Sequence, residues 1–165
     1  MSHRLIAMLI AAMLVVGACG SKPASGHAHG VPDQLQFSAT TLDGRQFSGE
    51  TLLGKPAVLW FWAPWCPNCQ REAPTVAKVA AANPTVTFVG VAARAEESAM
   101  REFVDKYHVD GFTQLADTKS AVWTKFGVTQ QPAYAFVQPD GSIDVVKGTM
   151  TESQLSERVS ALSKR

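Results

Sequence analysis

The chain has 165 residues, with 15 Lys and Arg against 14 Asp and Glu, which gives a formal net charge of +1. This length fits a single domain with its own hydrophobic core. Because the charge is balanced and Lys and Arg form no runs, the sequence predicts neither nucleic-acid binding nor electrostatic attraction to an anionic membrane surface.

Residues 1–18 have the features of an export signal. Arg4 precedes an unbroken apolar run at residues 5–16, which is shorter than the about 20 residues that a membrane-spanning helix needs. Removal of the leader is therefore predicted. Val16-Gly17-Ala18-Cys19 resembles the lipobox of bacterial lipoproteins, which implies a mature chain beginning at a lipid-bearing Cys19. A plain secreted protein without the lipid is the alternative.

The third cysteine favours the lipid. If Cys66 and Cys69 pair, Cys19 is left as a loose thiol in an oxidising compartment, and acylation removes that thiol. Residues 19–33 are rich in Gly, Ser and Pro and have little to bury, so they are predicted to be a flexible, lipidated tether. The tether would hold a folded domain, residues 34–165, off the outer face of the cell membrane.

Residues 34–165 alternate between strand and helix patterns. A hairpin is expected first, around Asp43-Gly44. The apolar runs predict strands, and apolar residues at helical spacing predict helices. Strands are expected at 57–62, 86–92, 114–116, 133–137 and 143–146, and helices at 67–82, 96–107, 119–126 and 151–162. This order predicts an α/β sandwich around a mixed central sheet.

Cys66 and Cys69 lie between a buried strand and a helix, separated by two residues. This spacing brings the two sulfurs within bonding reach across one helical turn. Unpaired N–H groups and the helix dipole stabilise a thiolate on Cys66, at the helix start. Cys66 is therefore the expected nucleophile, and Cys69, one turn deeper, is the expected resolving thiol.

The segment from Trp62 to Pro74, which reads WAPWCPNCQREAP, resembles the active site of the thioredoxin superfamily. It is most similar to the exported branch with TlpA, ResA and the cytochrome c maturation thioredoxins, and within it to the DsbE/DsbF-type proteins of actinobacteria. The resemblance runs from about Phe37 to the C-terminus. It implies a thioredoxin fold with an N-terminal β-hairpin extension and the activity of a thiol:disulfide oxidoreductase.

The resemblance also implies a substrate-binding edge. Pro132 matches the cis-proline opposite the active site of the family, and a cis bond there would leave the backbone of Gln131 free to pair with an extended substrate. An ordinary trans proline at a strand start is the alternative. Trp65 directly precedes the nucleophile, at a position that the family exposes, so it is expected on the rim that touches partners.

The sequence departs from cytoplasmic thioredoxins at Trp60, which stands where those proteins carry a buried acid. Glu72, three residues beyond Cys69, matches a glutamate of the exported branch. A half-buried carboxylate there would accept the proton of Cys69 when that thiol attacks. The alternative is an exposed glutamate on the helix surface.

Four functions fit this site to different degrees. The exported address, the Cys-Pro-x-Cys motif and the DsbE/DsbF resemblance favour an oxidase that forms disulfides in reduced exported proteins and is recharged by an unidentified membrane redox partner. A reductase of specific partners such as apocytochrome c is the main alternative. A copper-delivery module and a structural zinc site fit less well, because no further ligand set is evident. No cofactor beyond the Cys66–Cys69 disulfide and no metal is expected.

Overall fold

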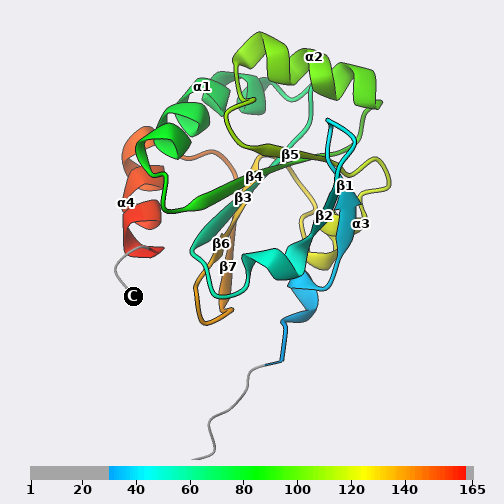
Figure 1. The fold of residues 1–165 in the computed structure, drawn as a ribbon. Helices are drawn as coiled ribbons and strands as arrows, with labels where there is room; N and C mark the ends of the chain where they lie inside the picture. The colour runs from blue at the N-terminus through cyan, green and yellow to red at the C-terminus, as the bar shows by residue number, and fades with distance from the viewer. Residues whose placement is uncertain (1–29, 163–165) are drawn as a thin grey trace, which may run out of the picture.

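The computed structural model describes residues 30–162, which fold around a five-stranded sheet (Figure 1). The strand order is β5-β4-β3-β6-β7. Strands β3 (Ala57–Trp62), β4 (Thr87–Ala92) and β5 (Thr113–Ala116) run parallel, whereas β6 (Ala133–Val137) and β7 (Ile143–Lys147) are antiparallel to their neighbours. The mixed sheet of the predicted thioredoxin fold is confirmed.

The predicted N-terminal hairpin is also confirmed. Strands β1 (Ser38–Thr40) and β2 (Gln46–Ser48) pair antiparallel, as a sheet of their own. A 3₁₀ turn at Asp33–Leu35 precedes them, and Val31 packs against the core of the domain. Folded structure therefore begins within the segment that the sequence analysis assigned to the tether. The predicted leader and Cys19 lie outside the described residues.

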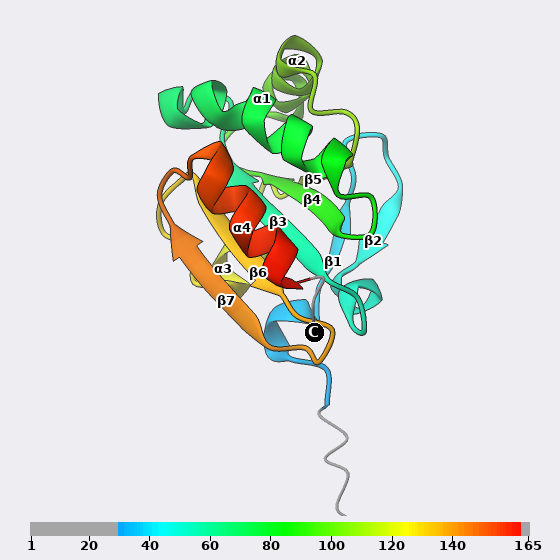
Figure 2. The same cartoon turned by 90° about the vertical axis from the view of Figure 1, so that its left-hand side faces the viewer.

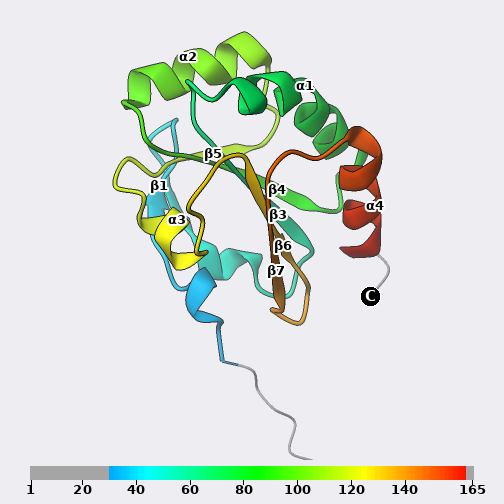
Figure 3. The same cartoon turned by 180° about the vertical axis from the view of Figure 1, so that it is seen from behind.

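Four helices cover the sheet. Helices α1 (Pro67–Ala82), α2 (Glu97–Tyr107) and α4 (Glu152–Leu162) contribute side chains to one core cluster, and α3 (Ala121–Lys125) contributes to the other. Figure 2 shows α4 in front of the strands and α3 behind them, and Figure 3 shows α3 beside the N-terminal segment, on the opposite side of the sheet from α4. None of the helices within residues 30–162 combines the length and apolar character needed to cross a bilayer.

Strand β3 lies at the centre of the sheet, and all six of its side chains are buried. Its residues alternate between the two cores, as the two-residue period of a strand requires. Val58, Trp60 and Trp62 face α1, α2 and α4, whereas Leu59 and Phe61 face α3 and the hairpin. Strand β3 is packed on both faces and paired with β4 and β6 along its two edges. The position of its end, from which the chain continues towards Cys66, is therefore fixed.

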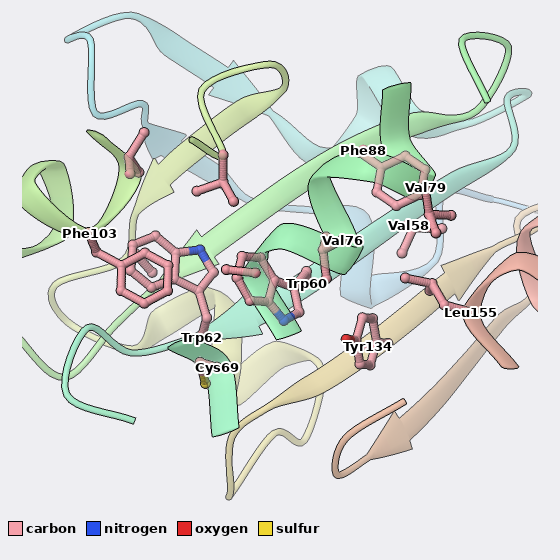
Figure 4. Close-up of a cluster of buried hydrophobic side chains, with 14 of the residues drawn as sticks. Val58, Trp60, Trp62, Cys69, Val76, Val79, Phe88, Phe103, Tyr134 and Leu155 are labelled. Atoms are coloured by element: carbon pink, nitrogen blue, oxygen red, sulfur yellow. The ribbon is translucent and has the colours of Figure 1, made fainter. Parts of the chain in front are cut away.

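Aromatic stacking organises the core beneath the helices. The ring centroids of Trp62 and Phe103 are 4.2 Å apart, and those of Trp60 and Trp62 are 5.7 Å apart. Figure 4 shows Trp60 between Tyr134 and the stacked rings of Trp62 and Phe103, with Cys69 at the edge of the cluster. The prediction that Trp60 and Trp62 are core residues is confirmed, since both are fully buried.

Candidate active site

Cys66 occupies the N-cap of α1, after the short segment Ala63-Pro64-Trp65 that follows the central strand. Its backbone lies in the extended region, and its Sγ accepts a hydrogen bond of 3.2 Å from the backbone N–H of Cys69. Pro67 takes the first helical position, where its missing N–H costs nothing. The sulfur of Cys66 thus accepts the backbone N–H that a serine or aspartate oxygen accepts at other helix starts.

The two thiols, both reduced in this structure, differ in accessibility. Cys66 retains 4% exposure, whereas Cys69 is fully buried. Burial, followed by the hydrogen bond with Cys66, raises the pKa of the Cys69 thiol. Cys69 therefore needs a proton acceptor before it can attack as a thiolate, whereas Cys66 is the one of the two that keeps some exposure.

Glu72 lies one turn further along α1 than Cys69 and is only 6% exposed. Its Oε1 accepts a hydrogen bond of 2.8 Å from the indole N–H of Trp60. Its Oε2 makes no well-aligned hydrogen bond among the described residues, although the Tyr134 hydroxyl and the backbone of Met150 also interact with the carboxylate. Burial raises the pKa of Glu72 to about 7, although the Trp60 hydrogen bond acts in the opposite direction. Glu72 is thus buried beside the deep thiol, and the surface-glutamate alternative does not fit this geometry.

Tyr134 completes the buried polar group. It lies on β6 directly opposite Trp60 of β3, and it is fully buried. Burial and the charge of Glu72 raise the pKa of the Tyr134 hydroxyl, which forms no well-aligned hydrogen bond among the described residues. The sequence analysis did not identify Tyr134. Its position two residues after Pro132, in the predicted strand 133–137, was the available signal. Side chains alternate between the two faces of a strand, so this position determines which face of the sheet the Tyr134 ring occupies.

The predicted substrate-binding residues meet at the same end of the sheet. The Gln131–Pro132 bond is cis, as expected. Since Ala133 pairs with Phe61, Pro132 lies beside the end of β3 that leads to Cys66. None of the described residues hydrogen-bonds with the backbone N–H or C=O of Gln131. Trp65 is 54% exposed, so the site has an apolar rim on one side and an unpaired backbone on the other.

Arg94 connects these two sides and was also missed by the sequence analysis. Its backbone C=O accepts a hydrogen bond of 2.9 Å from the indole N–H of Trp65, and its guanidinium donates to Gln131 Oε1 at 3.1 Å. The available signal was its place just after β4, since polar residues at the carboxyl ends of parallel strands often line a site. Within residues 30–162, His, Cys, Asp and Glu form no cluster of three or more that could hold a metal ion.

The fold and the thiol pair at a helix start define a thiol:disulfide oxidoreductase of the thioredoxin fold. A profile of the AhpC/TSA family matches residues 31–146, and the chain belongs to that family. It is 46% identical over 162 residues to the soluble secreted antigen MPT53 of Mycobacterium tuberculosis, which covers 96% of this chain and 91% of MPT53.

Two further similarities agree with the predicted resemblance to DsbE/DsbF and ResA. The chain is 30% identical over 128 residues to the thiol-disulfide oxidoreductase ResA of Bacillus subtilis, covering 76% of this chain and 71% of ResA. The solved structure of MTB DsbF superposes with a TM-score of 0.80 and 67% identity, covering 81% of this chain and 99% of DsbF. The predicted enzyme class is confirmed.

The difference in accessibility predicts how the two thiols behave when mutated. Cys66→Ser should abolish exchange, because the remaining thiol is fully buried. Cys69→Ser should accumulate reducible covalent complexes with client proteins, because the mixed disulfide on Cys66 cannot be resolved from within. Non-reducing gels of both variants, with and without dithiothreitol, measure this. Complexes formed by the Cys66→Ser variant instead would reverse the roles.

The raised pKa of Glu72 predicts a pH dependence of stability. A carboxyl with a folded pKa of about 7 and an unfolded value of about 4.3 binds more protons when folded, so stability falls as the pH rises between these values. Unfolding of the reduced protein in urea should lose about 2–3 kcal/mol between about pH 5 and about pH 8. Glu72→Gln should remove this loss and slow the Cys69-dependent step near neutral pH. Profiles identical to the parent in both measurements would make Glu72 a structural residue only.

Proposed function

We propose that the protein is an exported oxidase that donates its Cys66–Cys69 disulfide to reduced, newly exported proteins. The observation that carries this proposal is the N-cap hydrogen bond from Cys69 N–H to Cys66 Sγ. An oxidant is a couple whose reduced form is stabilised, and a sulfur that receives an N–H donor at a helix start is stabilised as thiolate. The similar MTB DsbF was solved in mixed oxidised and reduced forms, which supports a redox-active thiol pair.

The reaction uses two exchanges. A substrate thiolate attacks Cys66 Sγ, the Cys66–Cys69 bond breaks, and Cys69 leaves as a thiolate that takes up a proton. The second substrate thiolate then attacks the substrate sulfur of the mixed disulfide and releases Cys66 as a thiolate. The substrate is oxidised by two electrons and the enzyme is reduced by two. A membrane redox partner that accepts two electrons would restore the disulfide.

Glu72 serves the Cys69 step of this reaction. Its pKa of about 7 keeps both protonation states populated near neutral pH, as acid–base catalysis requires. In the oxidising direction Glu72 supplies the proton that the leaving Cys69 takes up. In the reverse direction it accepts that proton before Cys69 attacks.

A reductase of specific partners, such as apocytochrome c, is the second candidate. The similar ResA is named a thiol-disulfide oxidoreductase, a name that fits either direction, and the exchange steps of a reductase are the same ones in reverse. The two candidates differ in the reduction potential of the Cys66–Cys69 couple, because the direction of net electron flow depends on that potential relative to the partners.

The reduction potential is therefore the decisive measurement. We expect a value clearly above the about −270 mV of thioredoxin, towards the about −120 mV of a strong oxidant. The oxidised protein should also speed the refolding of a reduced, disulfide-requiring substrate, and the Cys66→Ser variant is the control. A potential at or below that of thioredoxin, together with no gain in refolding, would favour the reductase.

The proposed location is the outer face of the cell membrane, with the chain held by a lipid on Cys19. The lipobox-like Val16-Gly17-Ala18-Cys19 supports the lipid, whereas the similar MPT53 is named a soluble secreted antigen. In a lipoprotein-processing host, Cys19→Ala should move the protein from the membrane fraction to the soluble fraction. Fractionation followed by immunoblotting measures this. Equal distribution of parent and variant would contradict the anchor.

A further inference from the structure

Arg94 is held in one conformation at the active-site rim. Its backbone has a φ of 60°, in the left-handed region that few non-glycine residues adopt. Its C=O accepts the hydrogen bond from Trp65, the residue before Cys66. The backbone of Arg94 is thus fixed to one wall of the site, although the side chain is exposed.

The guanidinium of Arg94 is fixed to the opposite wall. It donates to Gln131 Oε1 and to the C=O of Thr129, both at 3.1 Å, and its Cζ lies 4.9 Å from the ring centroid of Trp123. The loss of side-chain freedom that binding normally costs has therefore already occurred in the folded protein. Two hydrogen bonds leave three of the five N–H donors of an arginine available.

Arg94 has no carboxylate partner among the described residues. Three of the other arginines in residues 30–162 do have one, since Arg45, Arg101 and Arg158 pair with Asp43, Glu97 and Asp144 respectively. The remaining one, Arg71, hydrogen-bonds with Asn68, the residue just before Cys69. The two described arginines without a carboxylate therefore both belong to the active-site rim.

No Asp or Glu within residues 30–162 forms an ion pair with Arg94, and this includes Glu96, two residues away. The Asp117 carboxylate, which lies near Trp123, is instead occupied by the backbone N–H groups of Ala121 and Trp123. Glu102 lines the surface hollow next to Trp65, but Lys106 lines the same hollow and opposes its charge. The rim of the site between Trp65 and Gln131 thus carries an arginine that is held by hydrogen bonds and forms no ion pair with the described residues.

We propose that Arg94 is a specificity-determining residue that favours polypeptide substrates with an Asp or Glu close to the reacting cysteine. An extended substrate beside Gln131 would place such a carboxylate within reach of the free guanidinium N–H groups, which match its geometry. Arg71 adds positive charge on the α1 side of the site. The inference rests on the proposed exchange with protein thiols, but it holds for either direction of electron flow.

Two peptides test this proposal, each with two cysteines and identical except that Asp or Asn flanks the reacting cysteine. The parent should oxidise the Asp peptide with a kcat/KM about fivefold higher than that of the Asn peptide, the scale of an exposed ion pair, and mainly through KM. Arg94→Asn should reduce this ratio to about one, because Asn tolerates the left-handed backbone and keeps the C=O for Trp65. Arg94→Lys should keep part of the preference.

Arg101→Asn is the matched control, because it removes another exposed arginine, one that binds Leu42 and Glu97 and does not hydrogen-bond with Trp65 or Gln131, and it should leave the ratio at the parent value. High salt should weaken the preference of the parent. Equal rates for the two peptides in the parent, or an unchanged ratio in Arg94→Asn, would overturn the proposal. Reduction by dithiothreitol is followed in parallel, since a parent disulfide that fails to react with it would contradict the proposed exchange function rather than the role of Arg94.

Discussion

The hydrogen bond from Cys69 N–H to Cys66 Sγ is the interaction around which the active site is arranged. It exists because α1 starts at Pro67, one residue after the nucleophile. The start of α1 is fixed in turn by β3, which is buried on both faces at the centre of the sheet. The central strand thus places the sulfur of Cys66 where a backbone N–H at the start of the helix donates to it.

The proton chemistry depends on a second buried interaction, between Trp60 and Glu72. A buried indole N–H without an acceptor and a buried carboxylate without a donor would each destabilise the fold. The 2.8 Å hydrogen bond between them satisfies one atom of each residue. Glu72 Oε2 makes no well-aligned hydrogen bond among the described residues, so the bond to Trp60 fixes one carboxylate oxygen while the other can take up a proton.

Local signals explain how well the fold was predicted. The boundaries of β3 and α1 agree with the sequence because Cys66-Pro67 and Asn83-Pro84 mark the ends of the helix. Helix α3 is shorter than the predicted 119–126, because the Asp117 carboxylate binds the N–H of Ala121 and Trp123 and starts the helix later. Arg94 and Tyr134 were missed because their contacts join segments that are distant in sequence, and no local pattern reports such contacts.

The pairing of Cys69 with Glu72 affects the rate of thiol–disulfide exchange but not the direction of net electron flow. The charge of Glu72 disfavours a thiolate on Cys69, so both groups ionised together in this buried space would be costly. Moving one proton from Cys69 to Glu72 keeps the net charge of the buried group constant, because the negative charge passes from oxygen to sulfur. Such a transfer lowers the barrier equally for oxidation and for reduction, since both pass through the same transition state. Glu72 can therefore set the rate of exchange but not its direction, which depends on how strongly the start of α1 stabilises the thiolate of Cys66 relative to the thiols of the substrate.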